Sequence, residues 1–331
     1  MDFRTVERAG LRLSELSLGC AQLGNLYRAV TDEQAQATVD AAWELGIRYF
    51  DTAPHYGLGL SERRLGQALA GRPRSEYVIS TKVGRLLEPL PEETGTDDGG
   101  FDVPATHRRV WDFSHDGVLR SLDGSLERLG LDRVDIVYLH DPDDHWSEAI
   151  GTAYPALEEL REQGAVSAIG AGMNQAEMLA DFARDTDMDV LMPAGRYTLL
   201  DQSALDDLLP ACDERGTKIV AAGVFNSGVL ARSSPTRDAK YDYTDVPDQV
   251  LRRAVRIDEI CRAHGVELPA AALAFPLANS VVASVCVGAR SPEQIKRNAS
   301  LYRSGVPAEL WVELRREGFL RADASTESGG R

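Results

Sequence analysis

The sequence of 331 residues predicts a single (β/α)₈ TIM barrel, and three observations support this fold class. Apolar runs of strand length alternate with amphipathic helical stretches, which is typical of a parallel sheet covered by helices. About eight such units follow one another, which favours a closed barrel over an open sheet. No composition break marks a domain boundary. We therefore expect one domain over residues 1–322 and a disordered tail over residues 323–331.

The expected elements follow the chain in order. Strands are expected at residues 16–19, 47–51, 77–82, 134–140, 166–170, 190–192, 218–222 and 281–288. Helices are expected at residues 32–45, 61–69, 117–129, 154–162, 175–184, 203–214, 250–264 and 292–300. Before the first unit, residues 4–6 and 11–13 flank Ala9 and Gly10 and predict an N-terminal β-hairpin that covers the barrel floor.

Two long connections interrupt the alternation, at residues 84–113 after the third strand and 225–247 after the seventh. Loops of this length in compact domains are typical of active-site lids or disordered segments. Both follow the carboxyl ends of strands, where barrel active sites are built. We therefore expect these loops to border the functional site.

Charge and cysteine content restrict the partners and the compartment. The net charge of −16 argues against nucleic acid or an anionic membrane surface as a partner. The four cysteines are scattered, which is typical of reduced thiols rather than of a disulfide framework. The N-terminus has no apolar targeting segment, and no run has the length of a membrane span. We expect a cytoplasmic protein whose oligomeric state stays open, a homo-oligomer included.

Four polar residues lie where apolar strands end. Asp51, Lys82 and His140 each close a predicted strand, and Tyr56 follows Asp51 in the next loop. In a barrel all four converge on the carboxyl-terminal face. A tyrosine has a pKa near 10, and an ammonium such as that of Lys82 lowers it. Asp51 then holds Lys82 charged, and His140 donates a hydrogen bond to the substrate oxygen beside Tyr56, an arrangement suited to general acid–base catalysis.

The chain resembles the aldo-keto reductase superfamily. The resemblance rests on GIRYFDTAPHYGLGLSERRLG, VISTKVG and RVDIVYLHD, and it extends from the first strand to SPEQIKRN. Further segments, among them IGAGMNQ and AGRYTLLDQ, are most similar to bacterial L-fucose and D-threo-aldose 1-dehydrogenases and to pyridoxal 4-dehydrogenase. The resemblance implies a catalytic tetrad of Asp51, Tyr56, Lys82 and His140 and a nicotinamide cofactor bound without a Rossmann domain.

The resemblance also implies where the nicotinamide lies. GAGMNQ mimics half of a G-x-G-x-x-G fingerprint but lacks its third glycine, so we reject a Rossmann interpretation. The family places a Ser-Asn pair for the carboxamide here; Asn174 is our candidate, one position beyond the most direct register. Ala194 replaces the family's glutamine and precedes Arg196, a further cofactor candidate. Alanines replace the family's stacking aromatic, and Phe225 is the candidate substitute, with core packing as its alternative.

The expected phosphate site joins two segments. They are Asn226, Ser227 and Gly228 after the seventh strand, and Gly288, Ala289 and Arg290 before a helix whose N-terminus suits a pyrophosphate. NADP-preferring relatives have a Lys-Ser pair and an arginine where this chain has Gly288, Ala289 and Gln294, which favours NAD. Arg290 and Arg297 leave NADP use open. Asn298 matches the family's adenine-contacting asparagine.

Aromatic and imidazole side chains are the substrate-binding candidates. His55 precedes Tyr56 and is either a substrate contact or a loop residue. Trp111 and Phe113 either form an apolar wall for a sugar ring or anchor the long loop to the barrel. The segment HDPDDH resembles a metal motif, but a solvated acidic loop is favoured over a metal site.

These residues favour an NAD(P)-dependent oxidoreductase that oxidises an aldose at C1 to its lactone, with Tyr56 as acid and base. Within the same class, an aldehyde or ketone reductase or a pyridoxal 4-dehydrogenase is the alternative. From another class, a non-catalytic cofactor-sensing regulatory subunit is the alternative, against which the intact tetrad argues. A metal-dependent hydrolase lacks a convincing ligand set.

Overall fold

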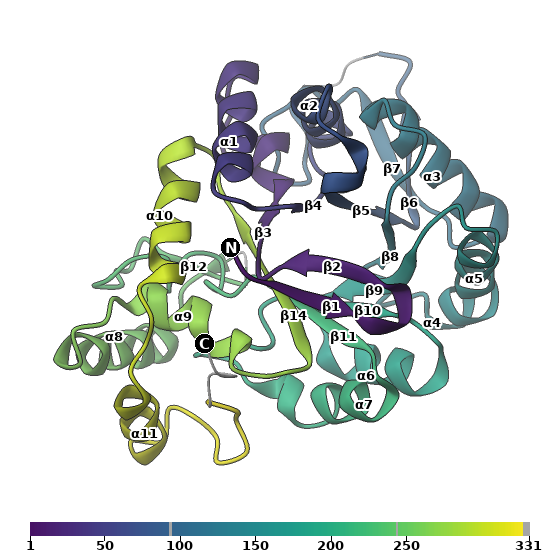
Figure 1. Ribbon diagram of the computed structural model, residues 1–331. Helices are drawn as coiled ribbons and strands as arrows, with labels where there is room; N and C mark the ends of the chain where they lie inside the picture. The colour runs from purple at the N-terminus through teal and green to yellow at the C-terminus, as the bar shows by residue number, and fades with distance from the viewer. Residues whose placement is uncertain (93–94, 243, 327–331) are drawn as a thin grey trace.

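A closed barrel of parallel strands forms the centre of the computed structural model, which describes residues 1–92, 95–242 and 244–326 (Figure 1). Over these ranges the barrel strands are β3 (Leu16–Gly19), β4 (Tyr49–Asp51), β5 (Val78–Val83), β8 (Ile136–His140), β9 (Ala168–Met173), β10 (Val190–Pro193), β11 (Lys218–Ala222) and β14 (Val282–Gly288). Neighbours around the barrel follow chain order, and β14 pairs with β3 to close it. The predicted fold class is confirmed, with each expected strand present.

Helices surround the barrel, as Figure 1 shows. Those that alternate with the barrel strands are α1 (Asp32–Glu44), α2 (Leu60–Leu69), α3 (His115–Leu129), α5 (Tyr154–Glu162), α6 (Ala176–Asp185), α7 (Leu208–Arg215), α8 (Asp248–Ala263) and α10 (Pro292–Arg303). Short helical turns are η1 (Glu7–Ala9), η2 (Cys20–Gly24), η3 (Arg74–Glu76), α4 (Trp146–Glu148), η4 (Ala149–Ala153) and η5 (Ser203–Leu205). No helix of the described ranges is long and apolar enough to cross a membrane.

Two helices were not expected from the sequence, α9 (Leu268–Leu277) and α11 (Ala308–Arg316). Helix α9 reads LPAAALAFPL and is buried along nearly its whole length. An amphipathic pattern needs a polar face, and a helix that is apolar all round gives no such signal. Pro276 inside the helix weakens the signal further.

The predicted N-terminal hairpin is confirmed. Strands β1 (Phe3–Val6) and β2 (Leu11–Ser14) pair antiparallel, and Gly10 between them has a φ of 62°. Val6 and Leu13 are fully buried and pack in one cluster with the interior barrel residues Tyr49 and Ile136. The hairpin crosses the barrel opening in Figure 1 and closes its amino-terminal end. The carboxyl ends of the strands are thus left for the functional site.

The long connection after β5 is a hairpin rather than an irregular loop. Strands β6 (Arg85–Pro89) and β7 (His107–Trp111) pair antiparallel over five residues each. Both strands mix charged and apolar residues without a regular period, so neither gives a run of apolar residues that would predict a strand. The connection after β11 contains a smaller pair, β12 (Lys240–Tyr241) and β13 (Thr244–Asp245).

The chain remains attached to the barrel beyond residue 322. Arg315 donates hydrogen bonds to the backbone oxygen of Ala324 at 2.9 Å and to the hydroxyl of Thr326 at 3.0 Å. Ala324 is buried. Residues 327–331 lie outside the described residues, so the domain boundary and the disordered tail stay predictions.

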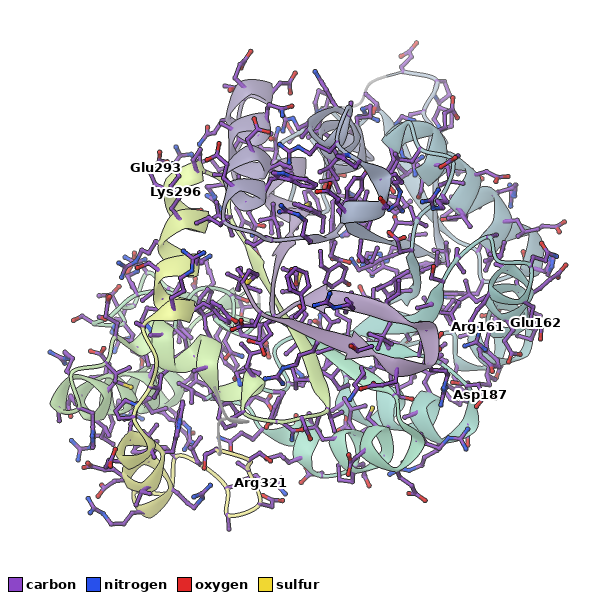
Figure 2. All side chains as sticks on the ribbon, viewed as in Figure 1. Arg161, Glu162, Asp187, Glu293, Lys296 and Arg321 are labelled. Carbon is purple, nitrogen blue, oxygen red and sulfur yellow. The ribbon has the colours of Figure 1, made fainter. Side chains whose placement is uncertain are left out.

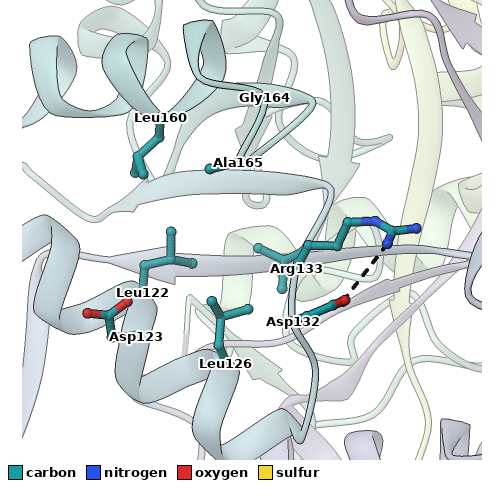
Figure 3. A pocket seen from close by; sticks show the side chains of 9 residues that line it. Leu122, Asp123, Leu126, Asp132, Arg133, Leu160, Gly164 and Ala165 are labelled. Carbon is teal, nitrogen blue, oxygen red and sulfur yellow. Dashed lines mark ion pairs between the residues drawn. The ribbon is translucent and has the colours of Figure 1, made fainter.

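A cavity of about 290 Å³ lies between α3 and α5, next to the amino-terminal ends of strands β8 and β9 (Figure 3). Leu122, Leu126 and Leu160 form much of its lining, and Asp132 and Arg133 form an ion pair of 3.9 Å at its edge. The carboxyl ends of the strands lie at the other end of the barrel. The cavity is therefore remote from the tetrad.

Candidate active site

The structure brings together Asp51, Tyr56 and Lys82 through one ammonium group. Lys82 Nζ donates hydrogen bonds to Asp51 Oδ2 at 2.7 Å, to the backbone oxygen of Thr52 at 3.0 Å and to the phenolic oxygen of Tyr56 at 3.0 Å. An ammonium has three hydrogens, so each is directed to one acceptor. The strand ends β4 and β5 supply this geometry because they are neighbours in the barrel.

Burial and charge together determine the state of Lys82, which is 3% exposed, as is Asp51. Burial by itself lowers the pKa of Lys82, but the Asp51 carboxylate and the Tyr56 phenol raise the pKa above its ordinary value. Lys82 is therefore charged at neutral pH. A fixed ammonium 3.0 Å from a phenol oxygen stabilises the phenolate form.

Asp51 is held by a chain of buried hydroxyls inside the barrel. Ser80 Oγ donates to Asp51 Oδ1 at 2.7 Å, and the hydroxyl of Tyr49 lies 3.0 Å from Ser80 Oγ. The hydroxyls of Tyr49 and Tyr138 are 3.1 Å apart. Burial raises the pKa of both tyrosines, so both hydroxyls keep their protons. This chain of hydroxyls was not predicted from the sequence, because its members are single polar residues within the largely apolar strands β4, β5 and β8.

Three rings form a triangle at the mouth of the barrel. Their centroids are 6.0 Å apart for Tyr56 and His140, 5.6 Å for His55 and His140, and 6.1 Å for His55 and Tyr56. Burial, and then the nearby Arg85 guanidinium, lower the pKa of His140 well below its usual value and that of His55 to about 3. Both imidazoles are therefore neutral at physiological pH.

One wall of the site comes from β7 and from Phe101 before it, neither of which sequence reasoning assigned. Phe101, which is buried, lies 5.2 Å from the His55 ring and 6.0 Å from the Tyr56 ring, centroid to centroid. Arg109 donates to the backbone oxygen of His55 at 3.1 Å and forms an ion pair with Asp97 at 2.6 Å. Phe101 is a lone aromatic within a Gly- and Asp-rich stretch, which is the one signal the sequence offers.

The two aromatic wall candidates have different surroundings. Trp111 is 44% exposed, stacks on Phe113 at 5.9 Å and lies under the Arg85 guanidinium at 4.2 Å. Phe113 is buried, and a Cβ added to Gly84 would lie 2.2 Å from its ring. Phe113 therefore has the position of a loop anchor, whereas Trp111 remains partly exposed.

The side chains of the segment HDPDDH, residues 140–145, have partners other than a metal ion. Asp141 pairs with Arg85, and Asp143 Oδ1 accepts a 2.6 Å hydrogen bond from Gln175. His145 Nδ1 lies 2.8 Å from Glu148 Oε2. Within the described ranges, no three His, Cys, Asp or Glu side chains gather as a metal-binding group.

Asn174, the candidate for the carboxamide contact, follows a strand that ends later than expected, at Met173 rather than Gly170. Strand β9 continues to Met173, so the glycines of GAGMNQ lie in the strand and α6 begins only at Ala176. Asn174 is the first residue after β9, and its backbone oxygen accepts a 2.6 Å hydrogen bond from Arg196 Nε. Arg196 also lies 3.4 Å from Asp201 and 3.3 Å from Asp242. It thus connects Asn174 to the connection after β11.

The segment after β11 presents an acceptor without a partner. Asn226 is buried with a φ of 44°, and its Nδ2 donates to the backbone oxygen of Gly195 at 3.2 Å. Its Oδ1 is buried and has no partner among the described residues. Ser227 and Gly228 also have positive φ, 57° and 116°. Phe225 is half-buried against the core.

The start of α10 forms the second expected phosphate segment. Gly288 ends β14 exposed, Ala289 is buried, and the Ser291 hydroxyl caps the helix. The backbone N–H of Arg290 donates to Gln294 Oε1 at 2.9 Å. The dipole of α10 favours an anion at this end of the helix.

Two of the cations on α10 have acidic neighbours. Arg297 pairs with Glu267 at 2.7 Å, and Lys296 lies beside Glu293 (Figure 2). Asn298 is half-buried further along the helix. Asn226 Oδ1, which has no partner among the described residues, and the amino-terminal end of α10 are chemically suited to a dinucleotide cofactor.

Known proteins resemble this chain along nearly its whole length. It is 53% identical to a D-threo-aldose 1-dehydrogenase of Pseudomonas sp over 92% of this chain and 94% of that protein. It is 40% identical to a pyridoxal 4-dehydrogenase of Microbacterium luteolum over 96% and 97%. A solved aldo-keto reductase from Bacillus halodurans in its holo form superposes with a TM-score of 0.75 at 26% identity, covering 99% of both chains.

A model of the Aldo/keto reductase family matches residues 15–314, which include all barrel strands and the four tetrad residues. The chain therefore belongs to the aldo/keto reductase family and is an NAD(P)-dependent oxidoreductase.

Proposed function

We propose that the protein is an NAD-dependent aldose 1-dehydrogenase that oxidises a D-threo-type aldose, such as L-fucose, at C1 to its lactone. The observation that carries this proposal is the position of Lys82 Nζ, 2.7 Å from Asp51 and 3.0 Å from the Tyr56 oxygen. A phenol beside a buried ammonium is suited to accept a hydroxyl proton. The aldose follows from the 53% identical relative, which is a D-threo-aldose 1-dehydrogenase.

In this proposal Tyr56 acts as a phenolate and takes the proton of the anomeric hydroxyl. His140, neutral because burial lowers its pKa, donates a hydrogen bond to the same oxygen and orients it. The nicotinamide, when bound, supplies the acceptor for the hydride that leaves C1. Loss of this hydride and of the hydroxyl proton turns C1–OH into C=O, and the cyclic sugar becomes a lactone.

The residues that we assign to the cofactor lie at the carboxyl ends of β9, β10, β11 and β14. Asn174, Arg196 and Phe225 would hold the nicotinamide half. Asn226, Ser227, Gly228 and the α10 start with Gly288, Ala289, Arg290, Gln294 and Asn298 would hold the rest. NAD is favoured because Gly288, Ala289 and Gln294 supply no cation for a 2′-phosphate and Arg297 is paired with Glu267.

We assign His55 and Trp111 to contacts with the sugar. Phe113 supports Trp111, since the centroids of the two stacked rings are 5.9 Å apart. We place the reaction in the cytoplasm, because all four cysteines are buried free thiols and suit a reducing compartment.

A substrate screen tests the proposal. The protein is incubated with aldoses, pyridoxal or simple aldehydes, with NAD and NADP cofactors in parallel, and the absorbance of the reduced nicotinamide is followed. We expect the highest kcat/KM with an aldose and NAD, and a lactone as product. Turnover of pyridoxal alone would favour the activity of the 40% identical relative instead. Absence of any turnover would favour a regulatory, non-catalytic role.

A further inference from the structure

We propose that His55 donates a hydrogen bond to the hydroxyl on C2, the carbon next to the reacting one, and so makes the enzyme selective for 2-hydroxyaldoses. This inference rests on the proposed aldose dehydrogenase function and adds a second recognition point to it. Tyr56 and His140 form hydrogen bonds with the reacting oxygen on C1. His55 forms one with the hydroxyl oxygen on C2.

The position of the His55 ring supports this role. Its centroid is 5.6 Å from that of His140 and 6.1 Å from that of Tyr56, so it is nearly equidistant from the two groups that bind the reacting oxygen. A sugar whose C1 oxygen lies between Tyr56 and His140 must present a neighbouring atom to the third ring. The polar neighbours of C1 in a cyclic aldose are the ring oxygen and the hydroxyl on C2, and we assign the C2 hydroxyl to His55 because it can both donate and accept a hydrogen bond.

The ring is held from behind. Phe101 packs against it edge-to-face, with centroids 5.2 Å apart and an interplanar angle of 88°. Arg109 fixes the backbone oxygen of His55 at 3.1 Å, and Asp97 fixes Arg109 through two hydrogen bonds of 2.6 and 2.9 Å. A side chain fixed in this way loses little further freedom when it binds a ligand, which favours selectivity.

The surroundings of its nitrogens make His55 a donor. Among the described residues, Nδ1 of His55 is buried without a hydrogen-bond partner, and so is Nδ1 of His140. A buried N–H without an acceptor leaves a donor unsatisfied, whereas a proton on Nε2 can be donated to a ligand. We therefore assign the proton of each ring to Nε2, and burial and Arg85 lower the pKa of His55 to about 3, which keeps the ring neutral.

Paired substrates and three variants test the inference. L-Fucose and 2-deoxy-L-fucose differ in the C2 hydroxyl alone, and the ratio of their kcat/KM values measures its recognition. His55→Phe keeps a ring of similar shape without the donor, His55→Gln keeps an N–H near the Nε2 position, and His55→Ala removes both. Wild-type enzyme should prefer L-fucose, because a site that binds a hydroxyl discriminates against the analogue that lacks it.

The expected results are specific to the donor. His55→Phe and His55→Ala should reduce the preference by about 3- to 10-fold, the value of one hydrogen bond, mainly through loss of activity with L-fucose. His55→Gln should retain part of the preference. An unchanged ratio in the Phe and Ala variants would overturn the role of His55 and leave the aldose function intact. Failure of the wild-type enzyme to oxidise either sugar would instead overturn the proposed function.

Discussion

The hydroxyl of Ser80 donates a 2.7 Å hydrogen bond to Oδ1 of Asp51, while Lys82 occupies the other carboxylate oxygen at 2.7 Å. Both residues are buried inside the barrel. The two hydrogen bonds therefore fix the orientation of the Asp51 carboxylate, which in turn holds the Lys82 ammonium toward Tyr56. Ser80 acts through Asp51 and is a positioning residue.

Ser80→Ala should lower kcat by about 10-fold, because a hydrogen bond to a buried charged group is lost. The pH at which the oxidation rate reaches half its plateau should rise, since a less fixed ammonium stabilises the phenolate less. Ser284→Ala is the matched control: Ser284 is a fully buried barrel serine that donates to the backbone oxygen of Ser14 at 2.8 Å. Equal losses in both variants, with unmoved pH profiles, would point to a general packing effect.

Tyr56→Phe should lower kcat by ~10²-fold or more, because the proton-transfer group is removed. The affinity for the cofactor should change little, as measured by titration of intrinsic fluorescence with NAD. The variant keeps the ring that packs against Phe101 at 6.0 Å, so the site should stay folded. A near-normal kcat would show that another group transfers the proton.

Lys82→Met should raise the pH needed for oxidation, because the ammonium 3.0 Å from the Tyr56 oxygen no longer stabilises the phenolate. Asp51→Asn should act in the same direction but less strongly, since it leaves the ammonium in place. The measurement is the pH dependence of kcat for both variants. Loss of activity with an unmoved pH profile in both would indicate a purely structural role.

Wild-type enzyme should show a higher kcat/KM with NAD than with NADP. Gly288→Lys combined with Gln294→Arg should shift the preference toward NADP by roughly 1–3 kcal/mol, about 5- to 150-fold, because charged donors bind the 2′-phosphate. A Cβ at position 288 would lie 2.3 Å from the side-chain amide of Gln22, whose flexible end must rotate away. A strong native preference for NADP would mean that Arg290, Lys296 or Arg297 binds the phosphate.

Stability should fall as the pH decreases below the ordinary histidine pKa of about 6.5. Burial lowers the pKa of His55 to about 3 in the folded protein, so below pH 6.5 the unfolded chain binds a proton that the folded chain does not. The unfolding free energy should therefore fall by up to about 1.4 kcal/mol per pH unit for this group. Urea titrations should show a shallower decrease in His55→Gln, and an identical slope would contradict the neutral, buried state of His55.

The sequence predicted the barrel because each strand is a separate apolar run, and it predicted the tetrad because polar residues such as Asp51 and His140 close those runs. The approach of Lys82 to Tyr56 follows from the pairing of neighbouring strands. Phe101 and Arg109 were missed, since their contacts with His55 join residues far apart in the sequence and follow no local pattern. Helix α9 was missed because a fully apolar helix has no period to detect.

The hairpin β1–β2 covers the amino-terminal end of the barrel. The interior hydroxyls of Tyr49 and Tyr138 are thus sealed from bulk water on that side. Substrate entry and product release therefore take place at the opposite end, where Tyr56, His55 and His140 lie. In the proposed reaction the sugar enters and the lactone leaves at this end of the barrel, so a lactone that leaves slowly should compete directly with the next sugar.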